Sequence, residues 1–219
     1  MRPGALDPYE TALASGTALA LHDGAGRRID LDVPRWLAPP DAADRSVLRR
    51  CGAPVLDIGS GPGRLVRALT ERGALALGID IAPAAVAHSV GTGAPAVHAS
   101  VFDALPNEGQ WSTALLIDGN IGIGGDVPRL LRRVRGLVGS GGRILVETTG
   151  SAYEDTVLDA RFAVPAGDQA HLTPTGPSFP WAVVGVRALR AHAARAGCQI
   201  VEEWSLFGRS FSALRPALA

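Results

Sequence analysis

The middle of the chain alternates short apolar segments with longer amphipathic ones. Five segments of strand length and apolar character occur at residues 55–58, 75–79, 96–102, 114–117 and 143–147. Apolar side chains at helical spacing lie between them and predict helices at 64–72, 83–90 and 127–138. Short apolar strands that alternate with helices are typical of a parallel, doubly wound α/β sheet.

After Gly150 this alternation weakens. Residues 151–180 contain four prolines and predict only two extended segments, at 157–164 and 169–172. A long irregular segment inside a compact domain is often a lid over a site, so we expect 151–181 to be a substrate lid. A helix at 186–196 and two strands at 199–206 and 210–214 follow, and their short connection makes the strands antiparallel neighbours. We therefore expect a mostly parallel, seven-stranded sheet with an antiparallel last strand.

The first part of the chain has a different pattern. A helix is expected around residues 9–21, an extended segment at 28–33, and a helix that ends near Arg50. This divides the chain into an N-terminal helical cap segment, residues 1–52, and an α/β domain, residues 53–219.

Composition and charge narrow the possible partners. The 219 residues carry 21 basic and 21 acidic side chains, and this balance argues against a general nucleic-acid binder. Every basic residue is arginine, which excludes chemistry that needs a lysine, such as a Walker A phosphate loop or a Schiff base. The two cysteines, Cys51 and Cys198, lack the spacing of a zinc site, and we expect no metal. No secretion signal or membrane span is apparent, so a cytoplasmic monomer or homodimer is expected.

The most informative motif follows the first of these strands. Residues 57–63 read Asp-Ile-Gly-Ser-Gly-Pro-Gly and lead directly into a helix. A sharp turn from strand to helix leaves backbone N–H groups free in a cleft, and glycines let a ligand approach them closely. Asp57 is placed to orient this turn. The dinucleotide fingerprint needs a glycine at the sixth position, where this chain has Arg64, so NAD is disfavoured.

Acidic residues close the next three strands, at Asp80, Asp103 and Asp118. The carboxyl ends of parallel strands share one rim of the sheet, where ligands bind. A carboxylate at Asp80 can accept hydrogen bonds from both hydroxyls of a ribose. At the next strand end, Asp103 can accept from an adenine amino group and the Ala104 N–H can donate to the ring. The apolar neighbours Ile81 and Phe102 suit the two faces of adenine.

These residues resemble the class I S-adenosylmethionine-dependent methyltransferase family. The match rests on the Asp-x-Gly-x-Gly-x-Gly motif, the acid at Asp80, the segment 101–104, the strand that ends at Asp118, and the closing antiparallel hairpin. The resemblance implies a Rossmann-like fold, S-adenosyl-L-methionine as cofactor and S-adenosyl-L-homocysteine as product. It also implies where the cofactor contacts the chain: the methionine moiety at Gly59, Ser60, Gly61 and Gly63, and the sulfonium near Asp118, Gly119 and Asn120.

The chain departs from the family in two places. Trp111 is followed by Ser112 where an aromatic-Asp pair is common, and residues 118–122 replace the Asn-Pro-Pro-Tyr type of signature. The second departure disfavours methylation of a nucleobase or of glutamine. A metal-assisted reaction is disfavoured because the strand at 143–147 does not end in the acid and amide pair that it needs.

Methyl transfer is an in-line displacement, so positioning supplies much of the rate. Asp118 and His171 are the candidate catalytic residues, and Tyr9, Tyr153 and Trp181 are candidates for the acceptor pocket. Trp36, Trp111 and Phe179 can also stack on a planar acceptor. We expect O- or N-methylation of a small molecule. The alternatives are a transferase of the same fold that moves another group, such as an aminopropyl transferase, and a non-catalytic protein that binds the cofactor.

Overall fold

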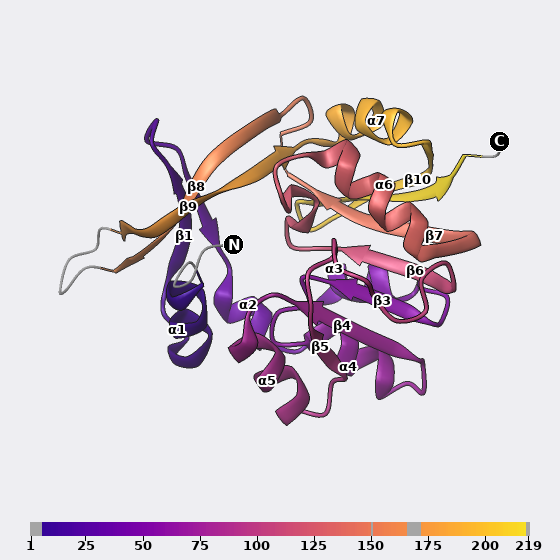
Figure 1. Ribbon diagram of the computed structural model, residues 1–219, viewed down its shortest axis with the longest axis horizontal. Helices are drawn as coiled ribbons and strands as arrows, with labels where there is room; N and C mark the ends of the chain where they lie inside the picture. Colours follow the sequence, from indigo (N-terminus) through magenta and orange to yellow (C-terminus); the bar gives the residue numbers. More distant parts are fainter. Residues whose placement is uncertain (1–5, 150, 166–171, 218–219) are drawn as a thin grey trace.

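The computed structural model describes residues 6–149, 151–165 and 172–217, and its strands form two sheets (Figure 1). The main sheet has seven strands in the order β10-β11-β7-β6-β3-β4-β5. Strands β3 to β7 pair in parallel, whereas β11 is antiparallel to both β7 and β10. The bounds are β3 Val55–Ile58, β4 Ala76–Asp80, β5 Ala96–His98, β6 Trp111–Leu116, β7 Val138–Thr148, β10 Cys198–Leu206 and β11 Arg209–Pro216. This confirms the expected fold class.

Helices cover both faces of the main sheet because its strands are apolar on both sides. Leu56 and Ile144 pack against α6 (Val127–Leu137) and α7 (Val186–Arg195) on one face. Their neighbours Val55 and Leu145 pack against α3 (Ala42–Leu48) and α4 (Arg64–Thr70) on the other. The buried side chains of α6 recur at spacings of three and four residues, which is the period of one helix face.

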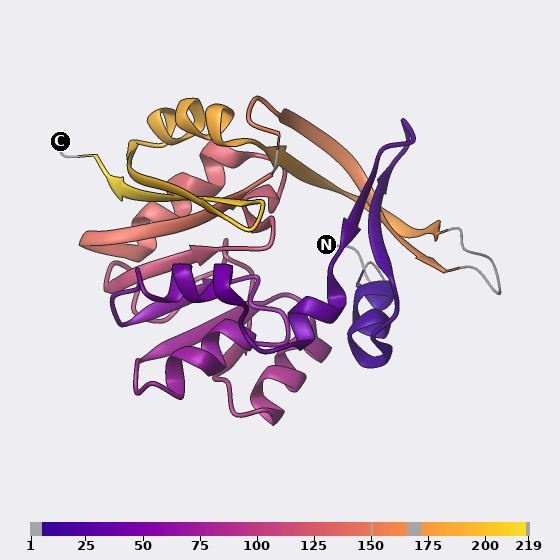
Figure 2. The ribbon, with the colours of Figure 1, turned by 180° about the vertical axis from the view of Figure 1, so that it is seen from behind.

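The second sheet has four antiparallel strands in the order β2-β1-β8-β9. We call it the small sheet; its strands are β1 Leu19–Asp23, β2 Arg28–Leu31, β8 Asp155–Pro165 and β9 Leu172–Val184. It therefore combines the N-terminal segment with the segment that the sequence suggested as a lid. Figures 1 and 2 show it beside the main sheet, with α1 (Asp7–Ser15) next to it. The short helices α2 (Val33–Leu37) and α5 (Pro83–Gly91) lie between this region and the main sheet.

Several expected boundaries were wrong for identifiable reasons. The first helix ends at Ser15, because Gly16 adopts a left-handed conformation with φ 69°, and the residues expected to continue it form β1. Prolines at 174, 177 and 180 lie within β9, which tolerates them because it is an edge strand. Residues 169–171 of the second extended segment lie outside the described residues.

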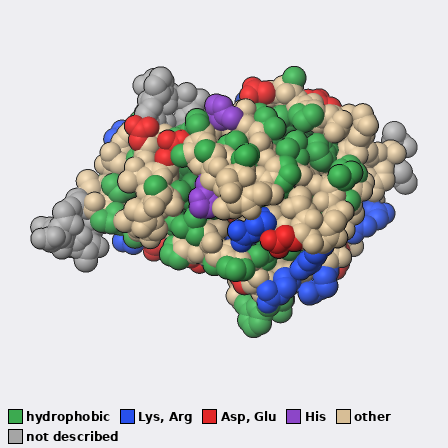
Figure 3. Space-filling view, turned by 90° about the horizontal axis from the view of Figure 1, so that it is seen from below, with side chains coloured by type: hydrophobic (Ala, Val, Ile, Leu, Met, Phe, Trp, Pro, Cys, Tyr) green, Lys and Arg blue, Asp and Glu red, His purple; other side chains and the backbone are tan. Residues whose placement is uncertain are grey.

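Two strands of the main sheet also differ from expectation. β5 ends at His98, and the residues after it turn toward the carboxyl ends of the strands instead of extending to 102. β7 begins at Val138 and includes the glycine-rich residues that predicted a turn. Among the described residues, no helix is long and apolar enough to cross a membrane. On the face seen in Figure 3, charged side chains gather in small groups among apolar and polar surface.

Candidate functional site

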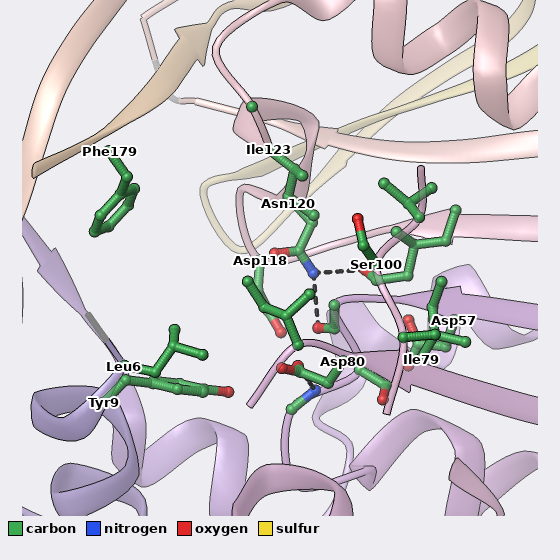
Figure 4. A pocket seen from close by; sticks show the side chains of 18 of the residues that line it. Leu6, Tyr9, Asp57, Ile79, Asp80, Ser100, Asp118, Asn120, Ile123 and Phe179 are labelled. Atoms are coloured by element: carbon green, nitrogen blue, oxygen red, sulfur yellow. Dashed lines mark hydrogen bonds between the residues drawn. The ribbon is translucent and has the colours of Figure 1, made fainter. Parts of the chain in front are cut away.

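A cavity of about 930 Å³ lies between the carboxyl ends of β3, β4 and β6 and the inner face of the small sheet. This volume is at the upper end of the usual range for small-molecule sites. One side is polar and is formed by the loops that follow the strands. The opposite side is apolar and is formed by α1, α2, β8 and β9 (Figure 4).

The glycine loop borders the polar side through Gly59, Ser60 and Gly61. Gly59 has a φ of 68°, and a Cβ there would lie 2.7 Å from the Asn120 Nδ2 atom, so no other residue fits without displacing Asn120. Gly63 does not line the cavity. Its missing side chain instead lets Ser89 and Ala94 pack closely beneath the loop.

Asp80 fixes the conformation of this loop from the end of β4. Its Oδ2 accepts a hydrogen bond from the Gly61 N–H at 2.8 Å, and its Oδ1 accepts one from the Ala82 N–H at 2.9 Å. The carboxyl is buried at the cavity wall, and this burial raises its pKa. Asp80 therefore presents a rigid carboxylate beside the glycine loop, in the place expected for a ribose partner.

The next strand end contributes Phe102 and Asp103 to the lining, whereas Ala104 lies outside it. The Asp103 Oδ2 accepts a hydrogen bond from the Ser100 N–H at 2.9 Å, so this carboxylate holds the turn after β5. The Arg129 guanidinium lies 4.4 Å from the centroid of the Phe102 ring, and this cation–π contact orients the ring at the cavity edge. Ile81 completes this apolar end.

Asp118 lies at the centre of a network of arginines. Its Oδ2 is 2.6 Å from the Arg64 Nη2, and its Oδ1 is 2.9 Å from the Arg35 Nη2 and 3.4 Å from the Arg209 Nη2. Its backbone has a φ of 60°, and its N–H donates to the Glu147 Oε2 at 2.8 Å. Both carboxylate oxygens are therefore held by guanidinium groups, an arrangement that suits electrostatic support better than proton abstraction.

Arg64 is itself buried, with 5% of its surface exposed. Besides Asp118 it pairs with Asp44, whose Oδ2 is 2.9 Å from the Arg64 Nη1. The nearby carboxylates raise the pKa of Arg64 although burial opposes this. Sequence reasoning used Arg64 only to exclude a dinucleotide and missed its role in this network, together with those of Arg35 and Arg209.

Asn120 joins the loop after β6 to the glycine loop. Its Nδ2 donates to the Ile58 carbonyl at 2.8 Å and to the Gly59 carbonyl at 2.9 Å. Because both partners accept hydrogen bonds, the amide nitrogen must face them. The adjacent Gly119, with a φ of 84°, shapes the turn and does not line the cavity.

Asp57 forms part of the cavity floor below the glycine loop. Burial raises its pKa to about 7; the charge of Arg64 opposes this rise, and those of Asp118, Asp80 and Asp44 add to it. With Asp103, the polar side of the cavity thus has four carboxyl groups, from Asp57, Asp80, Asp103 and Asp118.

The apolar side is a row of aromatic rings that we call the aromatic wall: Tyr9, Trp36, Phe162, Phe179 and Trp181. Neighbouring ring centroids in the row are 5.1 to 6.3 Å apart. Tyr9 lies at the lower edge of the cavity, with its hydroxyl directed toward Asp80 (Figure 4). Burial, followed by the charges of Asp80, Asp118 and Glu10, raises the pKa of the Tyr9 phenol well above its ordinary value, so Tyr9 stays protonated.

Two side chains suggested for the acceptor pocket, Tyr153 and Trp111, lie elsewhere. Tyr153 is 82% exposed and lies outside the cavity. Trp111 is 4% exposed in the core of the main domain, where its indole N–H donates to the Pro106 carbonyl. His171 lies outside the described residues. In the part of the chain that the structure describes, His, Cys, Asp and Glu side chains form no group of three that could hold a metal ion.

Comparison with protein families decides the identity of the chain. The model of the methyltransferase domain family matches residues 28–203. The chain belongs to this methyltransferase family. The match includes the whole polar side of the cavity and most of the aromatic wall, from Trp36 to Trp181. By family and fold the protein is a class I S-adenosylmethionine-dependent methyltransferase, and so an enzyme, as the motifs implied.

Solved structures agree with this fold. An S-adenosylmethionine-dependent methyltransferase from Bacteroides fragilis, solved with S-adenosyl-L-homocysteine, is 22% identical with a TM-score of 0.78, and the match covers 100% of this chain and 98% of that one. The methyltransferase CcbJ from Streptomyces caelestis is 16% identical over 84% of this chain and 92% of its own, with a TM-score of 0.62. A 1,6-didemethyltoxoflavin-N1-methyltransferase from Burkholderia thailandensis is 18% identical over 81% and 79%, with a TM-score of 0.57. The comparison with curated proteins gave no match.

The methyltransferase therefore brings most of the residues singled out in its sequence to one cavity. Those that line it are Tyr9, Trp36, Asp57, Gly59, Ser60, Gly61, Asp80, Ile81, Phe102, Asp103, Asp118, Asn120, Phe179 and Trp181. Phe162 was missed. It had no sequence signal of its own, because its place in the wall depends on the pairing of β8 with β1, in which it lies opposite Leu21.

Proposed function

We propose that this cavity binds S-adenosyl-L-methionine and that the enzyme transfers its methyl group to oxygen or nitrogen of a small-molecule acceptor. The observation that carries the proposal is the Asp80 carboxylate, which is fixed by the Gly61 and Ala82 N–H groups beside the glycine loop. Asp80 would hold the ribose hydroxyls, and Ile81 and Phe102 would enclose the adenine, with Asp103 at its edge. Gly59, Ser60 and Gly61 would border the methionine moiety.

The charge of the cavity fits this cofactor. A sulfonium is a cation, and the polar side of the cavity carries carboxyl groups at Asp57, Asp80 and Asp118. When bound, S-adenosyl-L-methionine supplies an electrophilic methyl group. The buried ion pairs of Asp118 keep the loop that carries Asn120 in one position, so this loop and the glycine loop form a rigid frame for the reacting groups. Orientation of this kind supplies much of the rate of a displacement reaction.

The small sheet supports a small acceptor. It closes the cavity opposite the strand ends, and we propose that it acts as the lid that the segment 151–181 suggested, with strands β1 and β2 from the N-terminal segment as part of it. The solved Burkholderia thailandensis enzyme binds 1,6-didemethyltoxoflavin and S-adenosylhomocysteine, and this supports the same class of acceptor here.

Isothermal titration calorimetry with S-adenosyl-L-homocysteine tests the cofactor site. We expect the wild type to bind it and Asp80→Asn to bind at least about 10-fold more weakly, because a carboxylate accepts hydrogen bonds about 1.4 kcal/mol better than a neutral amide. Asp159→Asn makes the same change on an exposed residue of β8 and should bind like the wild type. Absence of binding by the wild type, or equal binding of NAD, would contradict the cofactor assignment.

A transfer assay tests the reaction. S-adenosyl-L-methionine labelled in its methyl group is incubated with the enzyme and a small-metabolite extract, and label should appear in a product that depends on the enzyme. Binding without transfer to any component of the extract would contradict the proposed small-molecule acceptor. Transfer of the aminopropyl group from decarboxylated S-adenosylmethionine, with no methyl transfer, would favour an aminopropyl transferase.

A further inference from the structure

We propose that the methyl acceptor is a planar aromatic molecule without an anionic group and that it binds against the aromatic wall. The inference rests on the proposed function and specifies its acceptor. The chain has eleven aromatic residues (four Trp, two Tyr and five Phe), and six of them line this cavity. Five of the six form the aromatic wall, on the side opposite the strand ends.

The composition of the chain does not explain why so many aromatic residues gather at this cavity. Aromatic residues make up 5% of the chain, and its other buried clusters are built mainly from Leu, Val, Ile and Ala. The wall is also assembled from four elements that are distant in sequence: α1, α2, β8 and β9. A row of rings drawn from four elements and directed at one cavity suits a ligand that stacks on rings.

The rings form a continuous row with alternating geometry. Tyr9 stacks on Phe162 with an interplanar angle of 14° and a centroid separation of 6.0 Å, and Phe162 is tilted against Phe179 at 5.1 Å. Trp181 meets Phe179 edge to face at 6.3 Å. Flat rings arranged in this way offer both faces and edges to another flat ring, and each such contact contributes about 0.5–1.5 kcal/mol beyond burial.

The wall lies next to the place where the methyl group would be presented. Gly122 follows Asn120 by two residues, and a Cβ at this glycine would lie 2.7 Å from the Trp181 Nε1. The residue after it, Ile123, forms an isolated β-bridge with Trp181. Figure 4 shows Phe179 across the cavity from Asn120 and Asp118. A ring bound against the wall would therefore turn an edge toward the proposed sulfonium position.

The charges of the lining residues disfavour an acidic acceptor. Among the described residues that line the cavity, Arg64 is the single arginine, and its guanidinium is already paired with Asp118 at 2.6 Å and Asp44 at 2.9 Å. The same lining holds the carboxyl groups of Asp7, Glu10, Asp57, Asp80, Asp103 and Asp118. An anionic acceptor would meet these carboxyl groups and no arginine that lacks an ion-pair partner among these residues, and burying it there would be costly.

Three probes built on one fused bicyclic ring system test the proposal on the wild-type enzyme saturated with S-adenosyl-L-homocysteine. We expect 2-naphthol, which is planar and neutral, to bind at least about 10-fold more tightly than decahydro-2-naphthol, which is not planar, and than 2-naphthoate, which is an anion. Equal or tighter binding of either control would overturn the proposal. Failure to bind S-adenosyl-L-homocysteine would instead contradict the proposed function, so the two failures are distinguishable.

Substitutions in the aromatic wall test whether 2-naphthol binds there. Phe179→Leu and Phe162→Leu should each weaken 2-naphthol binding about 3- to 10-fold, the equivalent of one aromatic contact, and leave the affinity for S-adenosyl-L-homocysteine unchanged. Phe207→Leu makes the same change at a residue that is 78% exposed, outside the cavity, and should have no effect. Unchanged 2-naphthol binding in both wall variants, with their folding verified by circular dichroism, would place the probe elsewhere and overturn the proposal.

Discussion

The Asp118 Oδ2 lies 2.6 Å from the Arg64 Nη2, and this ion pair joins the loop after β6 to the first turn of α4. The two loops that frame the polar side of the cavity are thus held together by a buried pair. Arg35 and Arg209 share the other oxygen of the same carboxylate, which extends the connection to α2 and to the start of β11.

Removing the charge of Asp118 should destabilise the protein. In Asp118→Asn the buried Arg64 loses one of its two partners, and breaking such a pair typically costs about 3–5 kcal/mol of the free energy of unfolding. The change adds no backbone strain, because asparagine tolerates the φ of 60° at this position. Chemical denaturation measures the loss, and Asp159→Asn, on exposed surface, should change the free energy of unfolding by less than about 0.5 kcal/mol. Full stability of Asp118→Asn would contradict the structural role of the Asp118–Arg64 pair.

Asp57 should make stability depend on pH. Its folded pKa of about 7 is raised above the value of the unfolded chain, near 4, so the folded state retains a proton that the unfolded state releases. This contribution is complete below about pH 4 and is lost as pH rises to about 7, at a cost on the order of a few kcal/mol. Urea unfolding between pH 4 and 8 should show that Asp57→Asn has a flatter profile than the wild type. The control is Asp159→Asn. If the stability of Asp57→Asn changed with pH in the same way as that of the wild type and the control, the raised pKa of Asp57 would be contradicted.

The amide of Asn120 should not tolerate replacement by a carboxylate. In Asn120→Asp an oxygen faces the carbonyls of Ile58 and Gly59, which now receive hydrogen bonds at 2.8 and 2.9 Å. Two unpaired carbonyls and their repulsion should lower the free energy of unfolding by about 1–3 kcal/mol and weaken binding of S-adenosyl-L-homocysteine. Thermal unfolding and calorimetry measure both effects. Asn107→Asp, on an exposed turn, is the matched control, and an equal effect there would contradict a specific role for Asn120.

Replacing either of two glycines by alanine should change the free energy of unfolding, but in opposite directions. In Gly122→Ala the added Cβ meets the Trp181 ring and the Ala182 carbonyl, and such overpacking costs about 1–3 kcal/mol. In Gly136→Ala the Cβ meets nothing within 4 Å, and the exchange within α6 should add about 0.5–1 kcal/mol through helix propensity. Chemical denaturation of each variant and of the wild type measures the two changes in the free energy of unfolding. A neutral Gly122→Ala would show that β9 and the loop after β6 are not tightly packed.

Local sequence patterns were sufficient to predict the residues on the polar side of the cavity. The glycine loop and the acids at Asp80, Asp103 and Asp118 follow strands whose ends can be located from apolar runs, and parallel strands bring their carboxyl ends to one rim. The same reasoning could not separate residues that contact the cavity from those that pack behind it. Gly63 and Ala104 lie near the strand ends but outside the lining. Side-chain packing, and not strand order, determines which residues of a loop contact the cavity.

The sequence by itself determined the fold class, the family and the strand ends that line the cavity, because strand and helix periods and the glycine turn are properties of neighbouring residues. Tertiary structure alone decided the partners of Asp118 and the composition of the aromatic wall. Arg35, Arg64 and Arg209 come from three separate elements, and Phe162 reaches the cavity only because β8 pairs with β1 near the other end of the chain. Contacts between such distant segments depend on how complete sheets pack, and no local pattern records that packing.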